Sequence, residues 1–271
     1  MIKTPPDLLG QASAARGDAA AAARILPLVD LTSLNDADDG AAIGRLCDRA
    51  RNAGVAAACA YPRFVPLMKD RLRGSGVRVA TVANFPNGGD DIPAVVREVG
   101  AAVADGAEEI DVVIPLEAAL EGDVGLVTEL VQACREATPE QALKVILETG
   151  RLAEPARITA AARAAIMARP DFLKTSTGKA AVGATLEAAA ILLAVIEEAD
   201  GEVGLKLSGG IRTTQQAAQY LYLIDHFLNP GWVRPRTVRF GASALLDDLE
   251  RILGAAGAPD EDGDGDGDGG G

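Results

Sequence analysis

The feature that most constrains the fold of this chain is a strict alternation of short apolar runs with Ala-rich segments of helical spacing. Eight of these runs are bounded by Gly, Pro, Asn or Asp, which is the pattern of buried β-strands. They cover residues 25–32, 55–61, 78–85, 109–115, 143–149, 171–177, 203–208 and 237–242. Segments such as 118–137 and 186–198 between them have helical spacing. Strand–helix units in this order predict a parallel sheet closed as a (β/α)8 TIM barrel, an α/β fold.

The main alternative is an open, doubly wound sheet, which usually has a glycine-rich turn after its first strand. The first run ends in residues 30–35, DLTSLN, and this stretch contains no glycine. The turn chemistry therefore favours the closed barrel.

A length of 271 residues suits a single barrel domain, which we assign to residues 25–256. We assign the Ala-rich residues 1–24 to an N-terminal helical extension and expect one helix over residues 1–23 that covers the bottom of the barrel. Residues 257–271 are rich in Gly and Asp, and such a low-complexity composition predicts a disordered tail.

Charge and composition exclude several classes of partner. The net charge of -13 repels nucleic-acid phosphates and anionic lipids, so we expect neither nucleic acid nor membrane as a partner. No apolar run reaches the ~20 residues needed to span a bilayer, and the first residues lack the order of a secretory signal. The three cysteines have no paired spacing, which argues against disulfides and thiolate metal sites. We expect a cytoplasmic protein.

Lysine is the most informative residue type in this chain. Only six lysines occur, and four of them, Lys144, Lys174, Lys179 and Lys206, lie in or just after predicted strands. Barrel strands are covered on both faces and lysine is rarely fully buried, so lysines there require a reason. Catalysis is one reason, and structural pairing with carboxylates or snorkelling from strand ends is the other.

The single histidine, His226, lies in a helical stretch and is expected at the surface. A serine-histidine-aspartate triad, histidine base catalysis and a histidine-ligated metal site each need a histidine in the site. The expected surface position of His226 argues against all three. Lysine, carboxylate and hydroxyl groups remain, which is the set used in imine-forming catalysis.

Two of the lysines should lie side by side within the barrel. Lys174 lies in the middle of the run 171–177, and Lys206 shares a strand face with Gly204 and Ser208. Both are expected to face the interior from neighbouring strands. The sequence TGK at 177–179 is not a phosphate loop of nucleotide hydrolases, because Leu173 stands where that pattern needs glycine.

At these positions the chain resembles the 2-deoxy-D-ribose-5-phosphate aldolase family. The resemblance runs from about Leu26 to Leu249 and covers every predicted strand in order. The most specific matches are EIDVVIP at 109–115, DFLKTSTGK at 171–179, KLSGGIRT at 206–213 and RFGAS at 239–243. Further matches are DLT at 30–32, CAYPRF at 59–64, NFP at 84–86 and ETG at 148–150.

The resemblance implies a role for individual residues. Lys174 would form the Schiff base, with Asp111 and Lys206 as the acid/base and electrostatic pair. The substrate-contacting set is Asp30, Thr32, Cys59 and Thr177, among which Cys59 is expected to be a small packing residue and not a nucleophile. The phosphate-binding set is Gly178, Lys179, Gly209, Gly210, Arg212, Gly241 and Ser243. Within it, spacing alone leaves Lys179 open as phosphate ligand or structural cation, and Arg212 is expected to support its loop.

Two departures from the family pattern affect the expected chemistry. Ala244 stands where close family members have a second serine, which removes one phosphate donor. The chain ends in Gly/Asp repeats where those members often end in a tyrosine that relays a proton. A water held by Asp111 is the alternative relay.

The resemblance thus implies a class I aldolase that cleaves 2-deoxy-D-ribose 5-phosphate to D-glyceraldehyde 3-phosphate and acetaldehyde. No metal or organic cofactor is expected, because the lysine itself supplies the electrophile. The expected partners are small phosphorylated sugars and aldehydes, with a homodimer as one assembly to test. The alternatives are another Schiff-base phosphosugar aldolase and a non-catalytic barrel used as a binding scaffold.

Overall fold

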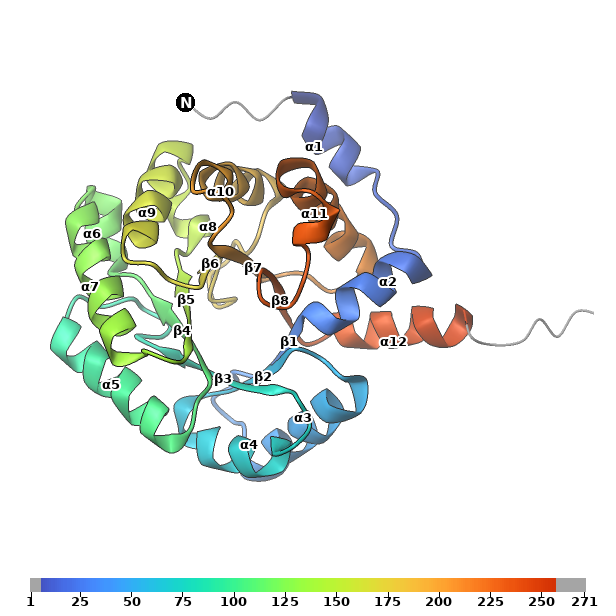
Figure 1. The fold of residues 1–271 in the computed structure, drawn as a ribbon, viewed down its shortest axis with the longest axis horizontal. Helices are drawn as coiled ribbons and strands as arrows, with labels where there is room; N and C mark the ends of the chain where they lie inside the picture. Colours follow the sequence, from blue (N-terminus) through green and yellow to red (C-terminus); the bar gives the residue numbers. More distant parts are fainter. Residues whose placement is uncertain (1–5, 257–271) are drawn as a thin grey trace, which may run out of the picture.

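A closed barrel of eight parallel strands forms the centre of the computed structural model, which describes residues 6–256 (Figure 1). The strands are β1 Val29–Thr32, β2 Ala57–Cys59, β3 Arg78–Ala83, β4 Glu109–Val113, β5 Ala142–Ile146, β6 Phe172–Lys174, β7 Gly204–Ser208 and β8 Val238–Ala242. Each strand pairs with the next in sequence, and β8 closes the barrel by pairing with β1. The predicted TIM barrel, a single domain, is confirmed. The predicted tail, residues 257–271, lies outside the described residues.

Every predicted run overlaps a strand, but the first strand begins later than expected. Ile25 ends a helix, and Leu26–Leu28 form a 3-10 turn before β1. Pro27 lies in this turn, and proline has no amide hydrogen to contribute to a strand ladder. The strand therefore begins at Val29.

The helices form a ring around the strands (Figure 1). They are α1 Pro6–Ser13, α2 Ala19–Ile25, α3 Gly40–Ala53, α4 Val65–Leu72, α5 Ile92–Asp105, α6 Leu116–Glu121, α7 Val124–Ala137, α8 Thr149–Leu152, α9 Pro155–Met167, α10 Leu186–Glu198, α11 Thr214–Leu228 and α12 Leu245–Ala256. The helical segment predicted at 118–137 is two helices. Gly122 ends α6 in the left-handed conformation, with φ 90°, and the Asp123 side chain caps α7.

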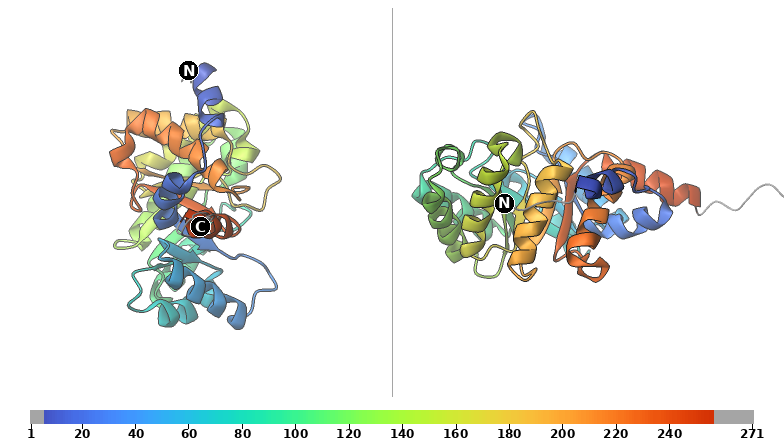
Figure 2. Two further views of the ribbon diagram at one scale, coloured as in Figure 1. Left: turned by 90° about the vertical axis from the view of Figure 1, so that its right-hand side faces the viewer. Right: turned by 90° about the horizontal axis from the view of Figure 1, so that it is seen from above.

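From residue 6 onward the N-terminal extension contains two helices where one was predicted, and they do not lie across the bottom of the barrel. Helix α1 packs along α11, and α2 packs against α11 and α12 in the outer layer (Figures 1 and 2). Leu8 and Ala12 are the buried contacts of α1. Gly17 lies in the connection between α1 and α2, and a methyl group there would lie 2.3 Å from the backbone nitrogen of Gln215. This close approach holds the extension on the side of the barrel.

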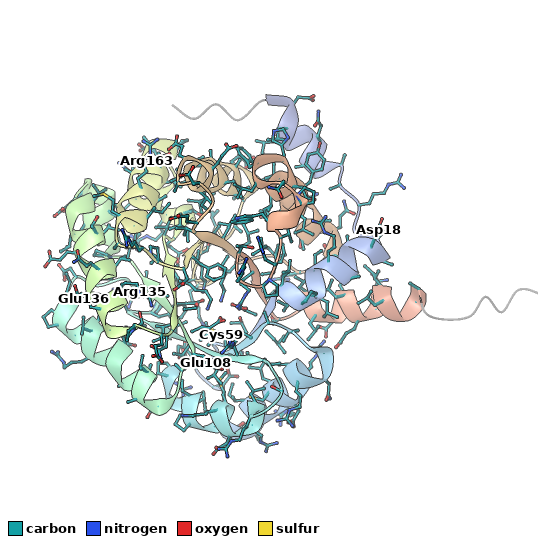
Figure 3. All side chains as sticks on the ribbon, viewed as in Figure 1. Asp18, Cys59, Glu108, Arg135, Glu136 and Arg163 are labelled. Atoms are coloured by element: carbon teal, nitrogen blue, oxygen red, sulfur yellow. The ribbon has the colours of Figure 1, made fainter. Side chains whose placement is uncertain are left out.

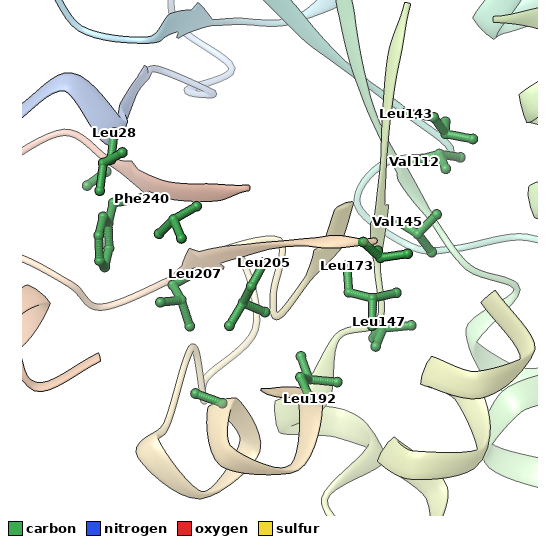
Figure 4. Packing of buried hydrophobic residues seen from close by; sticks show 14 of the residues in the cluster. Leu28, Val112, Leu143, Val145, Leu147, Leu173, Leu192, Leu205, Leu207 and Phe240 are labelled. Carbon is green, nitrogen blue, oxygen red and sulfur yellow. The ribbon is translucent and has the colours of Figure 1, made fainter. Parts of the chain in front are cut away.

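The main hydrophobic core lies between the strands and the helices. Leu143, Val145, Leu173 and Leu205 point outward from their strands, and Leu192 of α10 packs in the same layer (Figure 4). The alternate positions of each strand point into the barrel.

No helix in residues 6–256 is long and apolar enough to cross a membrane.

The barrel interior has two different halves. At β2 and β3 it is lined by small apolar side chains, namely Ala57, Cys59, Ala80 and Val82. The inward positions of the other strands include seven charged groups, which are Asp30, Glu109, Asp111, Lys144, Lys174, Lys206 and Arg239. The charged half is where the fold assembles groups able to do chemistry.

Candidate active site

A cavity of about 360 Å³ opens at the carboxyl ends of the barrel strands. Lys174 is the last residue of β6 and Thr32 the last of β1, and both line this cavity. The loops after β1, β6, β7 and β8 form the rest of the wall. The structure thereby brings together ten of the predicted site residues, which are Thr32, Lys174, Thr177, Gly178, Lys179, Gly209, Gly210, Arg212, Gly241 and Ser243.

Lys174 has the environment of an amine that can lose its proton. Its side chain is buried between β5 and β7, and its Nζ atom donates to Asp111 Oδ2 at 2.7 Å. Burial lowers the pKa of Lys174 and the Lys206 ammonium lowers it further, while Asp111 opposes both effects. The balance lies below the ordinary value, which increases the neutral, nucleophilic fraction at physiological pH.

Lys206 lies directly beside Lys174 in the register of β7 with β6. Its Nζ atom donates to Asp111 at 2.7 Å and to Asp30 at 2.5 Å. Burial disfavours its charge, but Asp111 and Asp30 outweigh burial and raise the pKa of Lys206. Lys206 therefore stays cationic beside an amine whose pKa is lowered.

Asp111 is the carboxylate that these lysines share. It is fully buried on β4 and also accepts from Lys144 Nζ at 2.8 Å. Burial alone would raise its pKa, but Lys144, Lys174 and Lys206 together hold the pKa of Asp111 well below its usual value. Asp111 is therefore ionised throughout the neutral range.

Asp30 lies beneath the cavity and not on its wall, although we expected it beside the substrate. Its carboxylate is fully buried and bonds Lys206 at 2.5 Å and Arg239 at 2.6 Å. Thr32, two residues further along β1, is the residue that reaches the cavity. Thr32 donates its hydroxyl to the Asp30 carbonyl at 2.8 Å.

Cys59 also lies away from the cavity wall. It belongs to the small apolar cluster of β2 and β3 and is fully buried near the centre of the barrel (Figure 3). Burial raises the pKa of the Cys59 thiol to about 11. The thiol is therefore protonated at neutral pH, as a packing role requires. Cys47 and Cys134 are buried and unpaired as well.

Three interior charges received no individual role in the sequence analysis: Lys144, Glu109 and Arg239. Lys144 is directly opposite Asp111 in the register of β5 with β4, and its Nζ atom lies 2.8 Å from Glu109. Arg239 bonds both Glu109 oxygens, at 2.7 and 2.9 Å. The available signal was period-two spacing, because Glu109 shares a strand face with Asp111, and Arg239 with Gly241.

Glu148 is a further residue that sequence reasoning quoted only within a motif. It is buried in the left-handed conformation, φ 53°, just after β5. Its carboxylate accepts hydrogen bonds from the Thr177 backbone amide and hydroxyl. This contact orients Thr177 on the cavity wall beside Lys174.

The glycines of the loops are needed for their backbone conformation and for space. Gly178, Gly209 and Gly210 have φ values of 80°, 88° and 84°, which favour glycine. A methyl group at Gly209 would lie 2.9 Å from Gly183 Cα, so the loops after β6 and β7 approach closely. A methyl group at Gly241 would lie 3.1 Å from Lys206 Cε, so this glycine leaves room for the lysine.

The cations at the cavity come from two loops. Lys179 donates its Nζ to the Leu34 carbonyl at 2.6 Å and so connects the loops after β6 and β1. The backbone amide of Arg212 donates to Gln216 Oε1 at 2.7 Å, next to a capping box between Thr213 and Gln216 that starts α11. Both cations line the cavity, together with the N-terminal approach to α11.

Comparison with known proteins gives a consistent assignment. Residues 24–229 match the family model described as DeoC/LacD family aldolase. A Coccidioides immitis structure titled a "putative deoxyribose-phosphate aldolase" is 30% identical, with TM-score 0.76 over 84% of this chain and 85% of that one. A similarly titled Toxoplasma gondii structure is 23% identical, with TM-score 0.82 over 88% and 95%. Deoxyribose phosphate aldolase from Aeropyrum pernix is 22% identical, with TM-score 0.72 over 92% and 98%. The last two similarities concern the fold.

Proposed function

This chain belongs to the DeoC/LacD family of aldolases, and we propose that it cleaves 2-deoxy-D-ribose 5-phosphate reversibly through a Schiff base on Lys174. The products are D-glyceraldehyde 3-phosphate and acetaldehyde. The observation that carries the proposal is a buried lysine of lowered pKa on the wall of a cavity rich in glycine and cationic side chains. We place this reaction in deoxyribose phosphate catabolism in the cytoplasm.

The reaction begins with neutral Lys174, which attacks the C1 carbonyl of the open-chain sugar. Loss of water gives an iminium ion. The C3 hydroxyl then loses its proton, the C2–C3 bond breaks, and its electron pair moves to the iminium, which becomes an enamine. D-Glyceraldehyde 3-phosphate leaves. Protonation of the enamine at C2 and addition of water release acetaldehyde and regenerate the amine.

Asp111 and Lys206 are the groups we propose for handling protons and charge. The ionised Asp111 carboxylate bonds Lys174 and so lies at the nitrogen that becomes the iminium. A water held by Asp111 exchanges protons with the C3 hydroxyl and the enamine carbon. Lys206 stays cationic and lowers the proton affinity of Lys174.

The phosphate end of the substrate is assigned to the loops after β6, β7 and β8. Positive-φ glycines at 178, 209 and 210 let the backbone approach an anion without side-chain obstruction. Lys179 and Arg212 supply positive charge at the same cavity. This local charge resolves how a chain of net charge -13 attracts an anionic substrate.

Borohydride reduction in the presence of acetaldehyde or 2-deoxy-D-ribose 5-phosphate tests the proposal. We expect a stable adduct on the peptide that contains Lys174, because the imine is reduced to a secondary amine. The Lys174→Leu variant should form no adduct there and should lose turnover by about 10³-fold or more. The matched control Lys69→Leu removes an exposed lysine and should retain both.

Three results would contradict this proposal. An adduct on a different lysine would reassign the nucleophile. Turnover of ketose phosphates without turnover of deoxyribose 5-phosphate would indicate another Schiff-base phosphosugar aldolase. Absence of both adduct and turnover would favour the non-catalytic scaffold.

A further inference from the structure

The charged side chains inside the barrel form a closed ring of alternating sign, which we call the charge ring. Three carboxylates and three cations contribute, and each member lies within 2.5 to 2.9 Å of two members of opposite sign. In order around the ring they are Asp111, Lys206, Asp30, Arg239, Glu109 and Lys144. All six are nearly or fully buried, and they come from β1, β4, β5, β7 and β8.

Lys174 lies outside this ring and is attached to it at one point. Its Nζ atom contacts Asp111 at 2.7 Å, and among the described residues it forms no second ion pair. The ring alone is balanced in charge, so a protonated Lys174 gives the buried cluster one uncompensated positive charge. Uncompensated charge in a buried site is costly, and a proton is lost most easily from the group with the fewest opposite charges around it. That group is Lys174.

The elements around Lys174 add little other charge within the barrel. On β2 and β3 the facing side chains are Cys59, Ala80 and Val82, and the thiol is protonated because burial raises its pKa to about 11. After β5, the Glu148 carboxylate is bonded to Thr177. Lys179 and Arg212 line the cavity above, where solvent screens them. The charge ring therefore dominates the field at Lys174.

Part of the ring is accessible from the opposite end of the barrel. Glu109 and Arg239 line a separate depression of about 600 Å³, together with residues at the amino ends of the strands such as Ala56 and Arg78. Neither residue lines the cavity that contains Lys174. A substitution at Glu109 consequently alters the charge count of the ring without changing a group that lines the substrate cavity.

We propose that Glu109, Arg239 and Lys144 are positioning residues that set the protonation state of Lys174 by balancing the charge of the ring. The inference rests on the proposed function, because it concerns the lysine assigned there as the nucleophile. None of the three has to touch substrate. The neutral form of Lys174 then depends on the charge count of six residues, and not on Lys206 alone.

This proposal predicts shifts of opposite sign for two substitutions in contact with each other. Glu109→Gln removes a negative charge, so the protonation midpoint of Lys174, the pH at which half of its amine is protonated, should fall by about one pH unit. Lys144→Met removes a positive charge, and Asp111, with one cationic partner fewer, attracts the Lys174 ammonium more strongly. The midpoint should therefore rise by about one unit. The double variant restores the balance and should return the midpoint to the wild-type value. A residue with a merely structural role would produce no such compensation.

The midpoint is measured by labelling with acetic anhydride over a range of pH, followed by mass spectrometry of the peptide that contains Lys174. The reagent attacks only the neutral amine, so the measurement does not require aldolase activity. Glu108→Gln is the matched control, because it is the same substitution at the adjacent residue, in a half-exposed pair with Arg78 outside the ring. It should leave the midpoint unchanged. Thermal unfolding establishes which variants fold. If Glu109→Gln does not fold, Lys144→Met still tests the proposal.

Unmoved midpoints in folded variants, or shifts of the same sign in both, would overturn the proposal. A midpoint in the double variant that fails to return would also do so. The wild-type borohydride experiment separates this failure from failure of the proposed function. An adduct on Lys174 with unmoved midpoints removes the charge-ring inference only, and shifted midpoints without any adduct remove the proposed function only.

Discussion

Lys174 and Lys206 are neighbours on β6 and β7, yet their surroundings move their pKa values in opposite directions. Burial lowers both pKa values. Lys206 has two carboxylate partners, Asp111 and Asp30, which reverse the effect of burial. Lys174 shares one carboxylate with two other ammonium groups, so burial and repulsion outweigh its single attraction. One residue type thereby supplies both a permanent cation and a nucleophile.

At the scale of one residue, Lys206→Leu should move the acidic limb of imine formation at Lys174 to higher pH by at least about one unit. Two unit charges ~5 Å apart at an effective dielectric of ~20 repel by roughly 3 kcal/mol, enough for about two pKa units. The substitution removes this repulsion and leaves Asp111 with one cation fewer. Because both changes favour protonated Lys174, the direction is unambiguous.

Single-turnover imine formation with acetaldehyde, followed against pH, measures this shift. Lys69→Leu changes the net charge equally at an exposed position and should leave the limb in place. If Lys206 instead acted as a proton donor or substrate ligand only, the variant would lose activity at every pH with an unmoved limb.

At the scale of elements, α11 connects the interior of the barrel to the loop that we assign to phosphate. The loop after β7 runs through Gly209 and Gly210 to Thr213, whose side chain caps the helix at the Gln216 amide. Gln216 in turn accepts from the Arg212 and Thr213 amides, at 2.7 and 3.2 Å. The start of α11 therefore holds the cavity loop in a defined conformation.

Thr213→Ala should reduce the free energy of unfolding by about 1 kcal/mol, the usual effect of removing a helix N-cap. It should also weaken binding of inorganic phosphate several-fold, because the loop loses its anchor. Calorimetry measures both quantities. Asp91→Ala removes the equivalent cap of α5, after β3, and should lower stability without weakening phosphate binding. Equal phosphate affinity in wild type and Thr213→Ala would contradict the assignment of this loop.

At the scale of the whole molecule, the charge ring joins side chains from five of the eight strands, β1, β4, β5, β7 and β8. Asp30 on β1 bonds Arg239 on β8, which are also the two strands that close the barrel. The ring lies in the charged half of the barrel interior, and β2 and β3 contribute small apolar side chains to the other half. Closure of the barrel and ionisation of the ring are therefore coupled.

This coupling predicts loss of stability in acid. The ring cations hold the pKa values of Asp30, Glu109 and Asp111 below their ordinary values despite burial. A carboxylate with a lowered folded-state pKa stabilises the protein above its unfolded pKa of ~4, and this contribution is lost as pH falls through the folded value. Three such groups give a slope of up to about 4 kcal/mol per pH unit below pH ~4.

The free energy of unfolding, measured in denaturant at several pH values, should be nearly constant from about pH 5 to 8 and then fall steeply below about pH 4. Glu109→Gln should reduce the slope of the free energy of unfolding against pH in acid by up to the contribution of one of the three carboxylates. The Glu108→Gln control should change this slope less. On the alkaline side, ring partners raise the pKa values of Lys144 and Lys206, so their contribution persists below about pH 10. A flat acid limb would contradict the ionised ring.

Much of the fold and part of the site follow from local sequence pattern. Alternating apolar runs and helical segments predict eight strands in order, because the two periodicities depend only on near neighbours. Period-two spacing also predicts that Lys206 faces inward, and the glycines at 178, 209 and 210 indicate the turns that surround the cavity. Helical spacing does not specify where a helix ends: Gly122 and Asp123 divide one predicted helix into two.

Local pattern specifies the identity of the elements and the face of each strand that carries lysine. Which charges meet depends on the tertiary structure. Asp30 and Arg239 are 209 residues apart and come together because β8 pairs with β1, and this contact removes Asp30 from the cavity wall where the sequence analysis placed it. Lys144 joins the charge ring through the pairing of β5 with β4, and Glu109 joins it through contacts with Lys144 and with Arg239 of β8. Register and closure depend on packing between distant segments, so no local pattern encodes them.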